Sequence, residues 1–182
     1  SKRVAEYSFR LGNYIGLDMN TLDILKMAAN FHDIGKIGIP DNVLSKTGSL
    51  TDEEFEIIKT HSTIGANILS VSDVFKDIAF IVKCHHERID GKGYPLGLSG
   101  DEIPYLSKII SVADTFDAMT SNRVYRNHMD TDYVMNEMKR GRGTQFDPEA
   151  LDAFLRLIDK GIINLDDIYA QKRAEIQGAD QE

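Results

Sequence analysis

The stretch I-I-S-V-A-D-T-F-D-A-M at residues 109–119 places one carboxylate, that of Asp114, in the middle of an apolar segment. Apolar residues surround it at helical spacing, which predicts a helix buried over most of its circumference. An unpaired charge in such a helix would cost several kcal/mol, so Asp114 needs a cation. A buried salt bridge to Arg123 or Lys108 would supply one, and so would a metal ion.

The rest of the chain has the same helical periodicity. Apolar residues recur every three or four positions almost everywhere, for example over residues 4–15. Thr51 followed by Glu54 predicts a capping box at the start of a further helix. Residues 35–40 and 90–104 are punctuated by glycine and proline and have no flanking strand pattern, so we expect loops there. These patterns predict an all-α helical bundle with a glycine-rich loop between helices.

Composition narrows the class of protein. The chain has 182 residues, of which 42% are hydrophobic and 27% are charged, as expected for one soluble domain over residues 1–182 with a polar, fraying tail at 170–182. The net charge of -8 argues against binding to a DNA or RNA duplex. A single cysteine, Cys84, and the absence of any leader-like or membrane-length apolar run favour the cytoplasm and no membrane contact by this domain. We expect Cys84 to be a core thiol.

Four of the five histidines lie where predicted helices end or face inward. His32-Asp33 precedes one glycine-rich turn, His85-His86 precedes another, and His61 follows an apolar stripe by three residues. An isolated His-Asp pair is usually a surface feature, and His61 alone could be a core histidine. Together, however, imidazole and carboxylate groups are the ligands of borderline divalent metals, so the pattern indicates a metal-dependent hydrolase.

Cations and glycines near these segments suggest an anionic ligand. Lys36 follows His32-Asp33 by one turn, while Arg123 and Arg126 share a helix face and could bind phosphate with two hydrogen bonds. Arg126 and Lys36 could each instead be a surface charge on a solvated helix face. Gly93 would let backbone approach a ligand closely, and Tyr94 could lay its ring against a base.

In chain order, these motifs resemble the HD-GYP family of the all-helical HD phosphohydrolase superfamily. They are H-D-I-G-K at 32–36, His61, H-H-E at 85–87, D-G-K-G-Y-P at 90–95, V-A-D-T-F-D-A-M-T-S-N-R at 112–123 and F-D-P at 146–148. The resemblance covers nearly the whole chain. It implies an HD-domain bundle with a GYP loop that hydrolyses the bacterial second messenger cyclic di-GMP in the cytoplasm.

The resemblance also implies roles for individual residues. Two divalent ions, iron or manganese, would be held by the metal ligands His32, Asp33, His61, His85, His86 and Asp114, with Asp33 bridging the ions. Substrate contacts would come from Lys36, Gly93, Tyr94, Arg123 and Arg126, and Asp117 would support the site. The expected reaction is attack by a metal-activated hydroxide on phosphorus, with Lys36 stabilising the developing charge. The product would be the linear dinucleotide, or GMP after a second cleavage.

The start of the chain departs from the family pattern. The family usually has a histidine just before the segment that matches residues 1–4, and some members have a glutamate further upstream that supports a third metal. The sequence opens at Ser1, which is not methionine, and its first residues are helix-like. We take this to indicate an output domain of a longer protein with an upstream sensor or receiver domain, and we expect a labile outer metal. A homodimer is compatible with the sequence.

Two other readings of function stay open at this stage. The first is an HD hydrolase that acts on another nucleotide, such as a mixed cyclic dinucleotide. The second is a receptor that binds cyclic di-GMP without turnover and signals to a partner through the loop at residues 91–95. A panel of substrates separates the first from the cyclic di-GMP reading, and binding without turnover after metal loading would favour the second.

Overall fold

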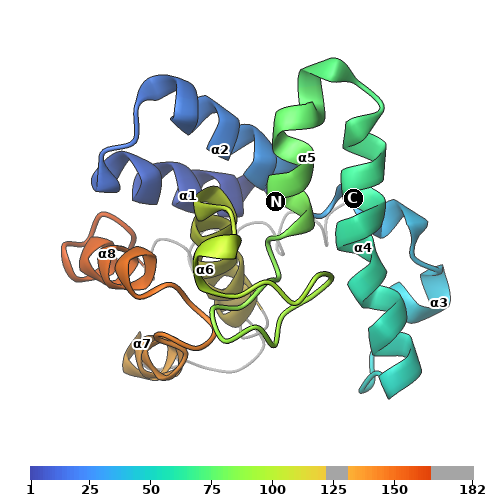
Figure 1. Ribbon diagram of the computed structural model, residues 1–182. Helices are drawn as coiled ribbons and strands as arrows, with labels where there is room; N and C mark the ends of the chain where they lie inside the picture. Colours follow the sequence, from blue (N-terminus) through green and yellow to red (C-terminus); the bar gives the residue numbers. More distant parts are fainter. Residues whose placement is uncertain (122–130, 165–182) are drawn as a thin grey trace, which may run out of the picture.

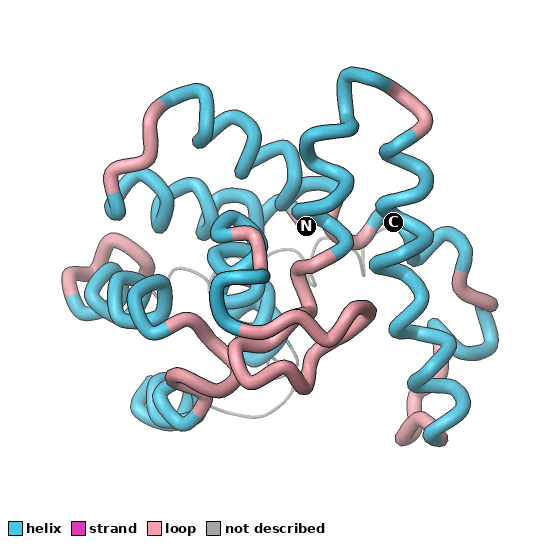
Figure 2. The backbone as a smooth tube through the Cα atoms, in the orientation of Figure 1, coloured by secondary structure: helices cyan, strands magenta, loops and turns pink. Residues whose placement is uncertain are grey.

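The protein is built of helices joined by loops, and no strand occurs within residues 1–121 and 131–164, the part that the computed structural model describes (Figure 2). The all-α prediction is therefore confirmed. None of the helices in these two ranges is long and apolar enough to cross a membrane. In chain order the elements are α1 (Lys2–Ile15), α2 (Met19–Phe31), the 3₁₀ helix η1 (Ile34–Gly38), α3 (Asp41–Leu44), α4 (Asp52–Ser70), η2 (Asp73–Phe75), α5 (Lys76–Lys83), η3 (Gly100–Glu102), α6 (Tyr105–Ser121), α7 (Thr131–Arg140) and α8 (Pro148–Asp159).

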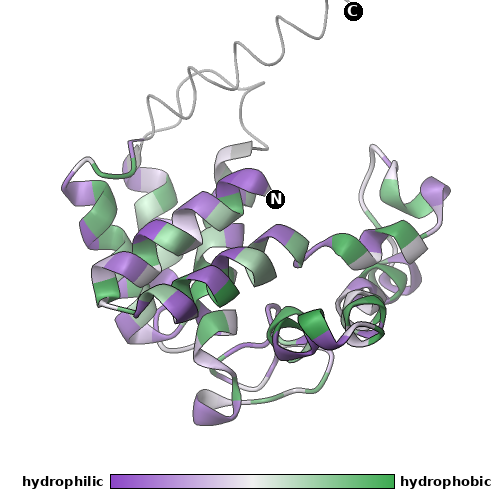
Figure 3. Ribbon diagram, turned by 90° about the horizontal axis from the view of Figure 1, so that it is seen from above, coloured by the Kyte–Doolittle hydropathy of each residue, from purple (hydrophilic) through white to green (hydrophobic). Residues whose placement is uncertain are grey.

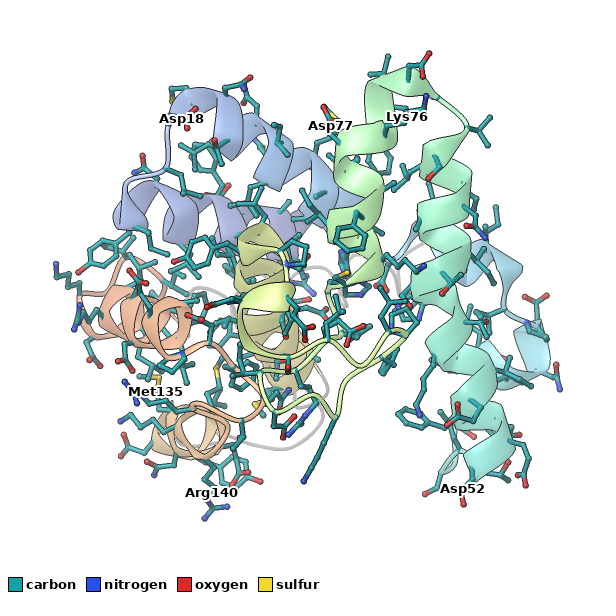
Figure 4. The ribbon with its side chains drawn as sticks, in the orientation of Figure 1. Asp18, Asp52, Lys76, Asp77, Met135 and Arg140 are labelled. Carbon is teal, nitrogen blue, oxygen red and sulfur yellow. The ribbon has the colours of Figure 1, made fainter. Side chains whose placement is uncertain are left out.

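Polar caps begin three of these helices. The predicted capping box of α4 is present, with the Glu54 amide donating to Thr51 Oγ1 and the Thr51 amide donating to Glu54 Oε2. Asp18 caps α2, and Asp147 caps α8 by accepting from two backbone amides. Figure 4 labels Asp18 beside the start of α2 and Asp52 at the first turn of α4. These caps satisfy amides that a helix start leaves unpaired.

The aromatic centre of the core lies where α1, α6 and α8 meet, and buried residues of α2, α5 and α7 extend the core from there. The rings of Tyr7, Phe116 and Phe154 come from these three helices and pack edge to face with centroids 5.0–6.5 Å apart. Figure 1 shows α1 and α2 side by side above α6, with α8 next to α6. The view in Figure 3 shows hydrophobic and hydrophilic stripes along the helices, as amphipathic helices require. On α7, Met135 is buried and Arg140 is exposed (Figure 4).

A second group of elements packs beside this core. α4 contacts both η1 and α5, and α5 in turn contacts α2. In Figure 1 the α4–α5 pair stands upright with α5 next to α2, and η1, which follows α2 in the chain, packs against α4. This arrangement brings the ends of α2 and α5 and the middle of α4, which are three separate parts of the sequence, to one region of the interior.

The two predicted loops contain short helical turns, which is a correction to the sequence prediction. Residues 34–38 form η1 and residues 100–102 form η3. Such 3₁₀ turns are only three to five residues long, so they carry no apolar periodicity that could reveal them. η1 is pressed against α4 at Gly35, where an added Cβ would lie 1.9 Å from the carbonyl oxygen of His61. Only glycine allows this contact between backbones.

Candidate metal centre

His32 and Asp33 lie at the junction of α2 and η1, and they face Asp114 on α6. His32 follows the last residue of α2 and is 1% exposed. Its Nε2 is 3.3 Å from Asp33 Oδ2 and 3.4 Å from Asp114 Oδ1. The other oxygen of Asp33, Oδ1, is 3.7 Å from His61 Nε2. Asp33 therefore lies between two imidazoles from different helices.

Three further imidazoles gather at the same place from α4 and from the end of α5. His61, His85 and His86 each offer a ring nitrogen, and these atoms lie within 4.8 Å of one another. His61 Nε2 and His85 Nε2 are 3.4 Å apart. Because the His32 and His85 rings also contact each other edge to face, with centroids 5.2 Å apart, all four histidines belong to one cluster.

The orientation of three of these rings is set by backbone carbonyls. In His32, His61 and His85, Nδ1 lies 2.5–2.7 Å from the carbonyl oxygen of the residue three positions earlier. A carbonyl only accepts, so we assign a proton to each Nδ1. This leaves Nε2 as the atom that each ring turns toward the cluster.

The convergent nitrogens fit a metal ion. If Nδ1 carries the proton in both His61 and His85, the two Nε2 atoms present lone pairs to each other at 3.4 Å. That contact is unfavourable unless a cation stands between the pairs. Imidazole nitrogen with carboxylate oxygen is a donor set suited to first-row divalent metals such as iron, manganese or zinc.

Burial keeps three of the imidazoles in the form that binds metal. Burial, followed by the charge of a neighbouring histidine, lowers the pKa of His86 to about 3. Burial is also the largest cause that holds the pKa of His61 and of His85 below the usual value. These rings are neutral at pH 7, and the neutral imidazole is the ligand form.

His32 behaves in the opposite way. Burial lowers its pKa, but hydrogen bonds and charges from Asp114 and Asp33 outweigh burial and raise the pKa of His32 to about 9. The same interactions lower the pKa of both carboxyl groups, although burial raises it. Without a metal, a proton on His32 thus balances the two carboxylates.

Lys36 adds a positive charge at the edge of this cluster. Its Nζ donates to Asp33 Oδ2 at 2.8 Å, and its side chain is 41% exposed. The ammonium group is therefore held by Asp33 and is accessible to solvent. A ligand that reaches the carboxylates would meet this cation.

The loop between α5 and α6 covers the histidines. The Tyr94 ring stacks on the His86 ring with centroids 4.8 Å apart and an interplanar angle of 28°. Glu87 is 3% exposed and accepts hydrogen bonds from the amides of Leu96 and Leu98 at 2.7 and 2.9 Å. Glu87 belongs to the H-H-E motif at residues 85–87, from which we predicted no role for it. The available signal was an acidic residue that directly follows two candidate ligands and precedes a glycine-rich loop.

The remaining predicted residues have other positions. Asp117 accepts from Arg3, with Nε 2.7 Å from Oδ1, so this pair joins α6 to α1. Lys108 was one of the two salt-bridge partners considered for Asp114, but its Nζ lies 3.5 Å from Asp147 Oδ2 instead. Arg123 and Arg126 lie outside the described residues, as does the tail at 170–182. Cys84 is buried, and burial raises its thiol pKa to about 12.

Known families and solved structures share the fold of this chain. Residues 1–150 match the HD domain family. The chain resembles an HDG"Y"P protein from Bdellovibrio bacteriovorus, with a TM-score of 0.68 at 21% identity over 84% of this chain and 49% of that one. A cyclic GMP-AMP-specific phosphodiesterase from Vibrio cholerae also gives a TM-score of 0.68, at 18% identity over 93% of this chain and 47% of that one. These likenesses show the fold.

Curated relatives have higher identity. A cyclic di-GMP phosphodiesterase from Thermotoga maritima is 44% identical over 96% of this chain and 47% of its own length. A cyclic di-GMP phosphodiesterase response regulator from Xanthomonas campestris is 42% identical over 85% of this chain and 42% of its own length. A 3'3'-cGAMP-specific phosphodiesterase from Vibrio cholerae is 37% identical over 88% of this chain and 31% of its own length. The chain thus spans less than half the length of each of these relatives.

Proposed function

Because the chain belongs to the HD domain family and carries the motifs of its HD-GYP group, we propose that it is a metal-dependent phosphodiesterase that hydrolyses cyclic di-GMP. The observation that carries the proposal is the convergence of imidazole Nε2 atoms and carboxylates in one interior cluster beside an accessible lysine. Relatives named as cyclic di-GMP phosphodiesterases, at 38–44% identity, support the choice of substrate.

We assign the metal ligands to the residues of the cluster. The donor set favours two divalent ions, and we propose iron or manganese. When bound, such ions supply the positive charge that makes water a nucleophile near neutral pH and that stabilises a phosphoryl oxygen. Asp33 lies between His32 and His61, and we propose that its carboxylate would contribute to holding both ions. The proposed ligands are His32, Asp33, His61, His85, His86 and Asp114.

The chain's own residues bind and orient the dinucleotide. Lys36 Nζ is fixed by Asp33 and faces solvent, so it can neutralise a phosphoryl oxygen and the departing 3' oxygen. Gly93 and Tyr94 border the cluster on the loop side, and Arg123 and Arg126 are proposed as further phosphate contacts. In the reaction one P–O3' bond breaks, the water oxygen bonds to phosphorus, and a proton goes to O3'. The product is a linear dinucleotide with a 5' phosphate.

The test is turnover by protein that has been stripped of metal and reloaded with Mn²⁺ or Fe²⁺. We expect cyclic di-GMP to be converted to the linear dinucleotide, with chromatography identifying the product. Asp33→Ala should abolish turnover because it removes a bridging ligand. Lys36→Ala should lower turnover with metal content retained, because it removes only a phosphate-facing charge. Loss of metal from Lys36→Ala would show that the role of the lysine is misassigned.

A second substrate is favoured by a specific observation. Three relatives from Vibrio cholerae at 36–37% identity are named 3'3'-cGAMP-specific phosphodiesterases. A panel that contains cyclic di-GMP, 3'3'-cGAMP and a linear dinucleotide therefore accompanies the assay. A larger kcat/KM for 3'3'-cGAMP would replace the proposed substrate, and binding of cyclic di-GMP without turnover of any substrate would indicate a receptor.

The wider context of the domain is also a proposal. The chain covers less than half of relatives such as a response regulator, so we propose that this domain acts as the output of a longer regulated protein. A hydrolase of a bacterial second messenger would act in the cytoplasm.

A further inference from the structure

His86 is oriented differently from the other clustered histidines. In the described residues, the Nδ1 atoms of His32, His61 and His85 each contact a backbone carbonyl, and no such contact occurs for His86. The His86 ring instead lies against the Tyr94 ring, with centroids 4.8 Å apart and nearly parallel planes. A ligand imidazole normally needs a partner that fixes its rotation. For His86 the aromatic stack takes the place of that partner.

The backbone of Tyr94 is hydrogen-bonded to the backbone of His86, one of the proposed metal ligands. Its amide donates to the carbonyl oxygen of His86 at 3.2 Å. The preceding residue, Gly93, lies so close to residues 86–88 that an added Cβ would stand 2.4 Å from the Arg88 nitrogen and 2.6 Å from the His86 oxygen. The loop and the end of α5 are thus in direct backbone contact, and the Tyr94 ring has little freedom to leave the imidazole.

Glu87 binds the part of the loop that follows Tyr94. Its side chain is 3% exposed, and its two oxygens accept from the amides of Leu96 and Leu98. A buried carboxylate that accepts two amides fixes the backbone on both sides of residue 97. Glu87 directly follows His86, so the residue that anchors the loop is the chain neighbour of a proposed metal ligand. Hydrogen bonds from Tyr94, Leu96 and Leu98 to residues 86 and 87 therefore hold residues 86–98 together.

We propose that Glu87 and Tyr94 are positioning residues for the metal centre, which they influence through the His86 imidazole. Glu87 holds the loop, the loop holds the Tyr94 ring, and the ring holds His86 in the rotation that turns it toward His61 and His85. This inference rests on the proposed metal site, and it does not depend on which cyclic dinucleotide is hydrolysed.

The alternative role for Tyr94 is a contact with substrate alone, as the family resemblance implies. The two roles give different results when the metal is measured separately from the nucleotide. A residue that only contacts substrate changes KM and leaves metal affinity unchanged. A residue that orients a ligand changes metal affinity, and excess metal restores the lost turnover.

The experiment is titration of the metal-free protein with Mn²⁺ in the absence of nucleotide, with free Mn²⁺ measured by electron paramagnetic resonance. Tyr94→Ala removes the stacked ring. Glu87→Gln keeps one acceptor oxygen and replaces the other by an NH2 group, which cannot accept a hydrogen bond from a loop amide. We expect each to weaken binding of one ion by about 10–100-fold, the range for loss of a group that orients a ligand. Tyr94→Phe keeps the ring and should keep the affinity. At saturating Mn²⁺, kcat of Glu87→Gln should recover with KM unchanged.

Glu102→Gln is the matched control. Glu102 lies in the same connection between α5 and α6 and also accepts from a backbone amide, that of Ser99 at 2.9 Å, but it is exposed and lies in η3. This variant should bind Mn²⁺ like the wild type. Circular dichroism checks that each variant folds. If Glu87→Gln does not fold, the Mn²⁺ titration of Tyr94→Ala tests the proposal, because Tyr94 is only half-buried. Wild-type Mn²⁺ affinity in folded Tyr94→Ala would overturn the proposal.

Discussion

Replacement of Gly35 by alanine tests what holds His32 and Asp33, at the start of η1, next to His61 on α4. Gly35 is the point at which η1, which follows the ligands His32 and Asp33, touches α4, which carries His61. A Cβ at residue 35 would lie 1.9 Å from the His61 carbonyl oxygen and 2.5 Å from the Gly65 nitrogen. Both atoms belong to the backbone of a helix, so neither can turn aside.

The expected magnitude follows from these distances. η1 and α4 must separate by about 1.5 Å before the new Cβ reaches van der Waals contact. Overpacking usually costs about 1–3 kcal/mol, and a clash between backbones belongs at the upper end of that range. For a domain of this size, about 3 kcal/mol lowers Tm by about 6–12 °C. The same movement draws Asp33 Oδ1 away from His61 Nε2, which are now 3.7 Å apart, so Mn²⁺ affinity should fall as well.

The assay is thermal unfolding followed by circular dichroism, together with Mn²⁺ titration. Gly48→Ala is the control, because a Cβ at residue 48 has no heavy atom within 4 Å and should leave both quantities unchanged. Gly65→Ala brings a Cβ to 3.2 Å from the Gly35 nitrogen and should be milder than Gly35→Ala. A Gly35→Ala protein with wild-type Tm and Mn²⁺ affinity would show that the contact of Gly35 with α4 does not hold the metal ligands in place.

Three further predictions concern other parts of the protein. Thr51→Ala removes the α4 cap and should lower the free energy of unfolding by about 1 kcal/mol in urea with turnover unchanged; altered turnover would link this distant cap to the site. Asp117→Asn removes the negative charge from the part-buried pair with Arg3 and should cost about 1–3 kcal/mol with metal content retained; loss of metal would place Asp117 in the site. The pKa of His32 is about 9 without metal, so binding at pH 7 should release about one proton, and affinity should weaken as pH falls below 9. Calorimetry in buffers of different ionisation enthalpy measures this proton release, and metal binding without proton release would contradict the assignment of His32 as a metal ligand.

The helical fold could be predicted from the sequence, and the histidine and aspartate segments that it singled out, at 32–33, 61, 85–86 and 114, lie together in the structure. His32-Asp33 and His85-His86 each follow a helix and precede a glycine, and helix ends in a bundle can converge on one interior point. The helical periodicity around Asp114 predicted a mostly buried carboxylate, and its side chain is 26% exposed beside His32. These features are local, and local patterns are what a single sequence records.

Features that depend on contacts between distant residues could not be predicted. Glu87 accepts from amides nine and eleven residues later, and backbone amides carry no sequence signal. Arg3 and Asp117 are 114 residues apart, and nothing local pairs them. The role of Gly35 needs the position of α4, which only the folded chain supplies. Long-range packing therefore decided the details that local patterns left open.

Whether the cluster of histidines and carboxylates binds divalent metal is tested most directly by anomalous diffraction from crystals of the Mn²⁺-loaded protein, recorded at the manganese edge. We expect anomalous peaks within the cluster, each about 2.0–2.3 Å from its ligand atoms, among them the Nε2 atoms of His32, His61 and His85 and the oxygens of Asp33 and Asp114. An empty cluster in protein that turns over cyclic di-GMP, or manganese bound only at other residues, would contradict it.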